Sequence, residues 1–337
     1  MLVRQLFDQD TFTYTYLVAD RAKGVAALID PVAGQLERDL KVIAELGLRL
    51  VLALDTHVHA DHITGAGQLR ERTGCRTIAS RKGAECVDQR VDHGDRLELG
   101  DLTIDVLATP GHTDDSVSYR VGENVFTGDA LFVRGTGRTD FQNGDAATLY
   151  RSITETLFAL PEDTIVWPGH DYRGHTATTI GEEKRHNPRV ANKTLAEFKA
   201  IMDNLNLPRP KYLDQAVPAN RECGLGLSES ETPHPAFKEL DTPHAMAFAR
   251  EQGATIVDVR EPHEFVGELG HIEGAESIPA GEIAQAALDW SFDTPLLVVC
   301  RSGRRSRGIC DQLINRGFRN VVNLRGGMVD YRKQRST

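Results

Sequence analysis

Three imidazoles and one carboxylate occur within six residues of this chain, directly after an apolar run. The apolar run covers residues 50–54, and the cluster consists of His57, His59, Asp61 and His62. Nitrogen and oxygen ligands in this mixture suit divalent metals such as zinc and iron. The cluster therefore predicts a metal site at the end of a buried strand.

Three further side chains that can bind metal each follow a glycine at the end of a predicted strand. The three pairs are Gly111–His112, Gly128–Asp129 and Gly169–His170. Glycine lets the backbone turn sharply and pass close to its neighbours, so several strands can deliver side chains to one edge of a sheet. A single histidine at a strand end is ordinarily structural, whereas seven such side chains in this pattern indicate one metal site.

A second group of reactive residues surrounds one cysteine near the C-terminal end. Cys300 ends the apolar run PLLVV and precedes a helical pattern from about Ser306 to Arg316. A thiol at a helix N-terminus is stabilised as thiolate, and the neighbouring Arg301, Gly303, Arg304, Arg305 and Arg307 allow a tight, cationic loop that could hold an anion. A phosphatase cradle has its arginine one position later, where this chain has Ser306.

Short apolar strands alternate with helical patterns along the first two thirds of the chain, which is typical of a layered α/β domain. Strands are predicted at 11–19, 25–30, 50–54, 102–108, 125–128 and 164–167, and helices at 34–48 and 146–160. This first domain covers residues 1–224, and a proline-containing linker covers 225–240. A smaller α/β domain follows at 241–337, with strands at 255–260, 275–279, 295–300 and 320–324.

Composition excludes several classes of function. The 337 residues carry a formal net charge of −10, which argues against nucleic acid or an anionic membrane surface as a partner. The N-terminal stretch lacks the apolar core of an export signal, and no apolar run is long enough to span a membrane. With five cysteines and no CxxC pair, we expect a cytoplasmic protein in which the thiols other than Cys300 are inert: Cys75, Cys86, Cys223 and Cys310.

The motifs of the first domain resemble those of the metallo-β-lactamase superfamily, and more narrowly its persulfide dioxygenase branch. The shared motifs are THVHADH, PGHT, TGDAL, VRGTGRTDFQ, PGHDY and VPAN followed by CG. The resemblance implies an αββα sandwich that holds one iron ion, Fe(2+), per chain through His57, His112 and Asp129. It leaves outside the first coordination sphere His59, Asp61, His62 and His170. Arg138 and Tyr172 are candidates for binding the glutathione part of a persulfide, with a structural ion pair as the alternative for Arg138.

The second domain resembles a single-domain rhodanese. The motifs are IVDVREPHEF, GHIEGAESIP, CRSGRRS and NLRGGM. This resemblance implies that Cys300 accepts a sulfane sulfur as a persulfide and passes it to an acceptor thiol. We expect Arg301 and Arg305 to act with Cys300 in catalysis, and Gly303 and Arg304 to bind the substrate.

Together the two resemblances imply a persulfide dioxygenase joined to a sulfurtransferase. The first domain would convert glutathione persulfide, O2 and water to glutathione and sulfite, and the second would exchange sulfane sulfur between thiosulfate and glutathione. A homo-oligomer is compatible with the sequence. The alternative is a thioester hydrolase of the glyoxalase II type, in which all seven residues bind two zinc ions. A second domain that only binds persulfides is disfavoured, because Cys300 is intact.

Overall fold

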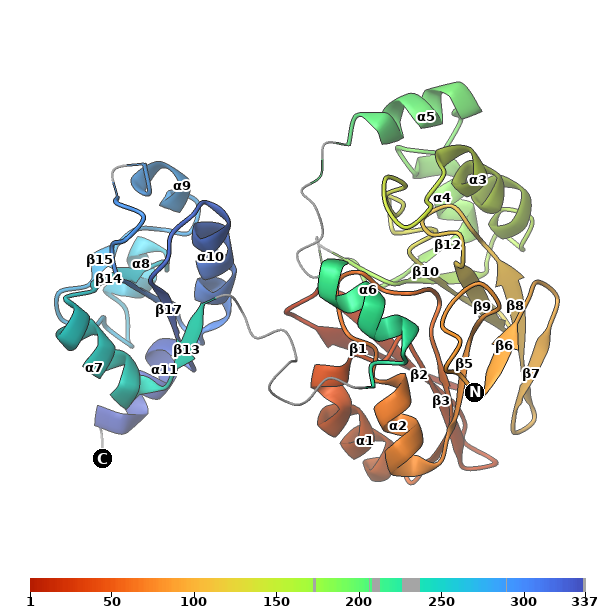
Figure 1. Ribbon diagram of the computed structural model, residues 1–337, viewed down its shortest axis with the longest axis horizontal. Helices are drawn as coiled ribbons and strands as arrows, with labels where there is room; N and C mark the ends of the chain where they lie inside the picture. Colours follow the sequence, from red (N-terminus) through yellow and green to blue (C-terminus); the bar gives the residue numbers. More distant parts are fainter. Residues whose placement is uncertain (172–173, 206, 208–212, 226–236, 289, 336–337) are drawn as a thin grey trace. The chain divides into compact units, whose positions relative to one another are not determined.

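The computed structural model describes residues 1–171, 174–205, 207, 213–225, 237–288 and 290–335 (Figure 1). Tyr172, predicted as a substrate-binding residue, lies outside the described residues. The contacts divide the chain into two compact units, residues 1–232 and 233–337. Within the described residues, no helix is both long enough and apolar enough to cross a membrane.

Two six-stranded sheets form the centre of the first unit. The first sheet has the order β1 (Leu2–Asp8), β2 (Thr13–Asp20), β3 (Val25–Ile29), β4 (Arg49–Leu54), β5 (Arg76–Ser80) and β6 (Gln89–Val91). The second has the order β12 (Thr178–Thr179), β11 (Ile165–Pro168), β10 (Asn124–Gly128), β9 (Val117–Val121), β8 (Leu102–Ala108) and β7 (Arg96–Leu99). One apolar core joins the inner faces of both sheets, so the strands form a sandwich.

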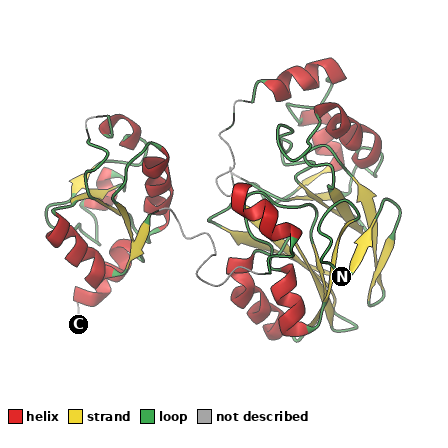
Figure 2. Cartoon of the chain, in the orientation of Figure 1, coloured by secondary structure: helices red, strands yellow, loops and turns green. Residues whose placement is uncertain are grey.

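Helices cover both outer faces of the sandwich, as Figure 2 shows in red. A short turn (Ala33–Gln35), α1 (Leu36–Glu45) and α2 (Ala66–Thr73) lie on the first sheet, with Leu36 and Ile43 buried against it. The second sheet is covered by α3 (Ala146–Arg151), its continuation Ser152–Leu157, α4 (Ile180–His186) and α5 (Leu195–Asp203). The helix α6 (Leu213–Arg221) follows. The αββα architecture that the sequence predicts is confirmed.

The strand directions bring the ends of several strands to one edge. In the second sheet, β8 and β10 both pair antiparallel with β9, and β11 pairs parallel with β10. The strands β8, β10 and β11 therefore run in one direction, and the residues that follow them lie at the same edge. The first sheet joins this edge through backbone hydrogen bonds from Val117 N to Thr56 O (2.8 Å) and from Tyr14 N to Gly169 O (2.8 Å).

The second unit is a small α/β domain around a parallel sheet. Its strand order is β13 (Lys238–Leu240), β17 (Val321–Leu324), β16 (Leu296–Val299), β14 (Thr255–Asp258) and β15 (Glu276–Ser277). Its helices are α7 (Thr242–Gln252), α8 (Pro262–Phe265), α9 (Ile283–Ala286), α10 (Arg304–Asn315) and α11 (Gly327–Arg335). Apolar clusters on the two faces of the sheet bury Val298 and Val299 against different helices, so β16 is covered on both sides.

Three local features differ from the sequence predictions. The predicted linker 225–240 ends in β13, which pairs with β17, so Lys238–Leu240 belong to the second sheet; residues 226–236 lie outside the described part. The predicted helix 146–160 is helical only to Leu157, with a wider final turn from Ser152. The helix after Cys300 starts at Arg304 rather than at Ser306, because Gly303 takes a left-handed conformation (φ 88°) that ends the loop early.

The expectation that Cys86 and Cys223 are isolated, inert thiols is wrong, because the two residues form a disulfide between positions 137 residues apart. Cys75, Cys300 and Cys310 are free and buried. Spacing could not reveal the pair, because the fold brings together a loop after β5 and the end of α6.

The aromatic contact between the two sheets provides a test of the sandwich core. Phe126 is 1% exposed and its ring centroid lies 5.0 Å from that of Tyr16. We expect Phe126→Ala to lower the free energy of unfolding of the first unit by about 3–5 kcal/mol, because it leaves a cavity between the sheets. Urea unfolding followed by Trp167 fluorescence, in a chain carrying Trp290→Phe, measures this. The exposed control Leu195→Ala should change the free energy of unfolding by less than about 0.5 kcal/mol. An equal loss in both variants would contradict the placement of Phe126 in the core between the sheets.

Candidate metal centre and cysteine site

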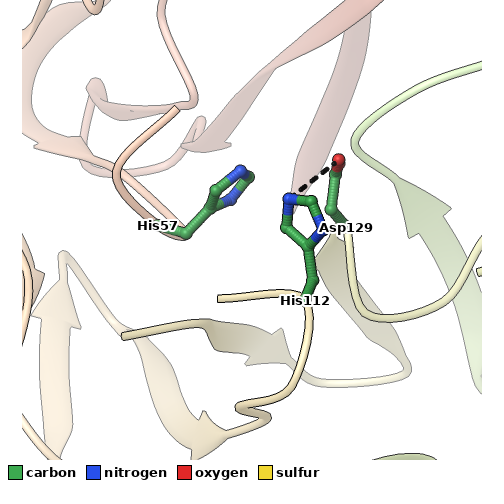
Figure 3. A group of neighbouring side chains, drawn as sticks. All are labelled: His57, His112 and Asp129. Carbon is green, nitrogen blue, oxygen red and sulfur yellow. Dashed lines mark ion pairs between the residues drawn. The ribbon is translucent and has the colours of Figure 1, made fainter. Parts of the chain in front are cut away.

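The seven predicted metal-binding side chains converge where the two sheets meet. His57, His112 and Asp129 form one group, in which one ligand atom from each residue lies within 4.8 Å of the others (Figure 3). A second group with the same property consists of His59, Asp61 and His62. His170 lies between the groups, since its Nε2 is 3.5 Å from Asp61 Oδ2 and 3.6 Å from Asp129 Oδ1.

Glycines let these side chains approach so closely. Gly111 takes a φ of 135°, and a Cβ there would lie 2.2 Å from the backbone nitrogen of Leu149. Gly169 packs against Asp129, and a Cβ there would lie 2.6 Å from Asp129 Oδ1. Any side chain at these two positions would push His112 or Asp129 out of place, which is the constraint that the glycine pattern in the sequence indicates.

Two histidines are oriented by backbone carbonyls. His112 Nδ1 lies 2.7 Å from the carbonyl of Arg138, and His170 Nδ1 lies 3.1 Å from the carbonyl of Phe12. Because a carbonyl only accepts, Nδ1 donates in both rings and carries the hydrogen. The Nε2 atoms of His112 and His170 are therefore available as ligands, and both face Asp129.

Carboxylates orient the other three histidines. His59 Nε2 lies 3.1 Å from Asp30 Oδ1, and His62 Nδ1 lies 2.9 Å from Asp61 Oδ2. The hydroxyl of Thr56 donates to Asp30 Oδ2 (2.9 Å), so it accepts from His57 Nδ1 at 3.0 Å. Fixing one ring nitrogen with an oxygen atom is the usual support of a metal-bound histidine.

The remaining ligand atoms are buried and lack hydrogen-bond partners within the described residues. They are His57 Nε2, His59 Nδ1, His62 Nε2 and Asp129 Oδ1. Buried polar atoms are nearly always satisfied, so a cluster of unpaired ones that point together fits a bound cation. Burial lowers the pKa of His57 and of His59 well below the usual range, and neighbouring imidazoles lower it further. Both rings are thus neutral, as a metal ligand requires.

Residues outside the predicted set bind the backbone of residues 56–62, the ligand loop. Asp30 also accepts from the backbone nitrogen of Thr56 (2.7 Å), and Asp115 Oδ2 accepts from that of Val58 (2.8 Å). Burial raises the pKa of Asp55 to about 7, and its carboxyl accepts from the hydroxyl of Thr64 (2.8 Å). Asp30 ends a predicted strand and could have been found by the strand-end pattern, whereas nothing in the local spacing marks Asp115.

Arg138 contributes its carbonyl to the metal centre and its guanidinium to a local ion pair. Nε and Nη2 of Arg138 donate to the two carboxylate oxygens of Asp140 at 2.6 and 2.7 Å. The guanidinium carbon lies 4.5 Å from the ring centroid of Phe141, and Nη2 also donates to the carbonyl of Leu207 (3.1 Å). An incoming carboxylate would have to displace or share Asp140, which makes the predicted substrate contact conditional on a rearrangement.

The second predicted site lies at the end of β16. Cys300 is 1% exposed, and its Sγ lies 3.3 Å from the hydroxyl of Ser306 in the first turn of α10. The loop between β16 and α10 packs on Gly326 and Gly327, since Met328 N donates to the carbonyl of Cys300 (2.9 Å). Cys300 thus lies where the α10 N-terminus can stabilise negative charge on sulfur.

The four arginines of this loop and of the first turn of α10 differ in their partners. Arg305 forms a bidentate pair with Glu264 of α8 (2.6 and 2.7 Å), and Arg307 pairs with Glu239 of β13 (3.3 Å). Arg301 and Arg304 are exposed and form no ion pair in the part of the chain that the structure describes. Arg301 and Arg304 are therefore the exposed arginines of this set without an ion-pair partner within the described residues, while Arg305, also exposed, ties the helix to α8.

Family comparison assigns both units. A model described as the metallo-beta-lactamase superfamily matches residues 8–85 and 87–170, and one described as the rhodanese-like domain matches residues 242–334. Human persulfide dioxygenase ETHE1, mitochondrial, is 47% identical over 228 residues, which are 67% of this chain and 89% of that protein.

Solved structures agree with this assignment. The crystal structure of ETHE1 from Myxococcus xanthus is 62% identical with a TM-score of 0.66, and covers 66% of this chain and all of that one. A metallo-beta-lactamase structure from Staphylococcus aureus is 24% identical with a TM-score of 0.65, covers 96% of this chain and 98% of that one, and shows the fold alone.

The Arg305–Glu264 pair predicts a dependence of stability on pH. The hydrogen bonds from Arg305 lower the pKa of Glu264 from 4.5 to about 2. A lowered carboxyl pKa stabilises the fold above pH 4.5, and this contribution is lost as the pH falls toward 2. Because the pair is partly exposed, we expect Glu264→Gln to cost less than about 1 kcal/mol at pH 7.

The difference between wild type and Glu264→Gln should shrink as the pH falls below 4.5. Unfolding of the second unit, followed by Trp290 fluorescence in a chain carrying Trp167→Phe, measures it. Glu251→Gln, at an exposed position of α7, is the control and should show little effect at either pH. A difference for Glu264→Gln that stays constant from pH 7 to pH 3 would show that the ion pair does not contribute.

Proposed function

Because this chain belongs to the metallo-β-lactamase superfamily, with persulfide dioxygenase relatives and a C-terminal rhodanese-like domain, we propose that it oxidises a persulfide and transfers sulfane sulfur. The first unit would convert glutathione persulfide, O2 and water to glutathione and sulfite. The second unit would exchange sulfane sulfur between thiosulfate and glutathione through Cys300.

The difference between the two carboxylates of the centre carries the first half of the proposal. Asp129 Oδ1 is buried and has no hydrogen-bond partner within the described residues. In contrast, Asp61 Oδ2 already accepts from the hydroxyl of Thr13 (3.0 Å) and faces His62 Nδ1 (2.9 Å). The group of His57, His112 and Asp129 is therefore the better ligand set for one ion, and we assign one Fe(2+) to it.

Two imidazoles and one carboxylate on one face are the ligand set of Fe(II) oxygenases, which react O2 with a substrate at the open positions. The protein supplies the arrangement around that face. The Arg138 carbonyl fixes the His112 ring, and Thr56 fixes the His57 ring, so both lone pairs point to one place. His57 and Asp129 are buried, and His112 is partly exposed.

A persulfide is the substrate class that the names of the relatives support, and we propose glutathione persulfide as the member of that class. A carboxylate of glutathione could bind Arg138 if the guanidinium turned from Asp140, because a guanidinium binds carboxylates bidentately. We also propose Tyr172 as a contact of the same substrate, since it follows His170 by two residues.

The unpaired His59 Nδ1 and His62 Nε2 keep the hydrolase alternative open. These atoms belong to the second group and are buried without a hydrogen bond within the described residues. If that group bound a second ion, the two ions together could activate water for thioester hydrolysis. This alternative requires two ions per chain and turnover of a thioester without O2.

At Cys300, the proposed sulfur transfer proceeds in two displacements. The thiolate attacks the sulfane sulfur of thiosulfate, so a new S–S bond forms, the sulfur–sulfur bond of thiosulfate breaks, and sulfite leaves. The thiolate of glutathione then attacks the outer sulfur of the enzyme persulfide, which releases glutathione persulfide and restores the Cys300 thiolate. We propose that Arg301 and Arg305 act with Cys300 in this transfer, with Arg305 also pairing with Glu264, and that Gly303 and Arg304 bind the anionic donor.

Removal of any one residue of the assigned ligand set should abolish oxygen uptake. The variants His57→Ala, His112→Ala and Asp129→Ala each remove one of three anchors of the ion. We expect no O2 consumption with preformed glutathione persulfide in an oxygen electrode. The exposed control His244→Ala should behave as wild type. Uptake retained in any of the three variants would refute the assignment of that residue.

A coupled assay tests whether the two sites share glutathione persulfide. With thiosulfate and glutathione supplied, oxygen uptake should need both Cys300 and the metal ligands. Cys300→Ser should eliminate it, because a hydroxyl does not form the persulfide, while uptake from preformed glutathione persulfide remains. His57→Ala should show the reverse, with sulfur transfer kept and uptake lost from either donor. If Cys300→Ser took up oxygen from thiosulfate at the wild-type rate, the second unit would not be the supplier of glutathione persulfide.

A further inference from the structure

The end of α6 holds the ligand loop through one buried amide. Asn220, which is 3% exposed, donates from Nδ2 to the carbonyls of His59 (2.9 Å) and His62 (2.7 Å). Its Oδ1 accepts from the backbone nitrogen of Thr64 (2.8 Å). One side chain thus bonds three backbone groups of the segment 59–64, which contains the second candidate metal group and leads to α2.

The disulfide lies directly beyond this contact. Cys223 follows Asn220 by three residues and is bonded to Cys86 in the loop after β5. The carbonyl of Cys223 accepts from the backbone nitrogen of Gly67 (3.0 Å), and a Cβ on Gly224 would lie 2.1 Å from the carbonyl of Thr64. The segment 220–224 is therefore packed on the backbone of residues 64–67 as well as on the ligand loop.

Few side chains of α6 are buried within the described residues. The helix has nine residues, contains Pro218, and buries only Ala216 and Asn220 among them. A short helix of this composition gains most of its stability from tertiary contacts. The contacts at its C-terminal end, which include the disulfide, therefore decide where the Asn220 amide lies.

We propose that Asn220 is a positioning residue of the metal centre and that the Cys86–Cys223 disulfide keeps it in place, so that reduction of this disulfide weakens metal binding. The proposal rests on the metal site of the proposed function, but not on which metal or substrate that site takes. Groups behind the ligands hold the ligand geometry, and their loss typically costs about 10–100-fold in metal affinity.

The reduction is a two-electron step. A phosphine reductant attacks one sulfur atom, and the S–S bond breaks. Water then hydrolyses the phosphorus–sulfur bond that has formed, which releases the thiol and the phosphine oxide. Each sulfur atom gains one electron and one hydrogen, so that Cys86 and Cys223 become thiols. Cys86 is half-buried, which gives a small reductant access to the bond. Cellular thiols would do the same by exchange, with their own disulfide as the product.

The first test compares Asn220→Ala with Asn124→Ala. Asn124 is also buried and hydrogen-bonded, but it lies at the end of β10 remote from Asp129. Anaerobic competition between each chain and a chelator for Fe(2+) gives the dissociation constant. We expect Asn220→Ala to raise it about 10-fold or more, and Asn124→Ala to leave it unchanged. Equal constants for wild type and Asn220→Ala, or equal losses in both variants, would overturn the positioning role.

Hydrogen exchange of the metal-free chain provides a readout that does not involve metal. The amide of Thr64 should exchange faster in Asn220→Ala than in wild type, because its acceptor is gone. Unchanged exchange at residues 59–64 would overturn the proposal even if the protein bound no iron. If the proposed function were wrong, the wild-type chain would take up no oxygen, but the Thr64 amide would still exchange faster in Asn220→Ala than in wild type.

The second test addresses the disulfide. Treatment of the wild-type chain with the phosphine should raise the Fe(2+) dissociation constant, and Cys86→Ala should show the raised value before and after treatment. Cys75→Ala removes a buried thiol of the same unit and should respond to the phosphine as wild type does. A wild-type constant that does not change once mass spectrometry shows complete reduction would overturn the role of the disulfide.

Discussion

The metal centre depends on a single constraint, which is that every imidazole of the centre has one ring nitrogen held by an oxygen atom of the protein. Backbone carbonyls hold His112 and His170, and Asp30 holds His59 directly and His57 through the hydroxyl of Thr56. The other nitrogen of each ring then points away from its partner. Those partners lie next to strands of both sheets, since Phe12 precedes β2, Asp30 follows β3 and Arg138 lies in the loop after β10. The sandwich therefore determines where the remaining ligand atoms meet.

Much of this centre can be predicted from the sequence, because strand ends carry their own signals. Apolar runs identify β4, β8, β10 and β11, and a candidate metal ligand follows each of them directly or after a short turn. The glycines before His112 and His170 mark places where no side chain fits. Alternation and spacing report local geometry, and local geometry determines which edge of a sheet a residue reaches.

The rest depends on contacts between distant segments, which spacing does not report. The Asp140 carboxylate that pairs with Arg138 lies two residues away, yet only the folded loop shows that the guanidinium turns toward it. Cys86 joins Cys223 across 137 residues. The early start of α10 follows from the left-handed Gly303, and only the folded chain shows that Arg305 of this helix pairs with Glu264.

The central claim is that one ion is held by two imidazoles and Asp129, which differs from Asp61 in that its buried Oδ1 has no hydrogen-bond partner within the described residues. The most direct measurement is elemental analysis of the purified, full-length chain, with iron and zinc determined against protein concentration. We predict one iron per chain, with oxygen uptake from glutathione persulfide proportional to iron content across preparations. Two zinc ions per chain, with uptake independent of iron, would contradict the claim and favour the hydrolase.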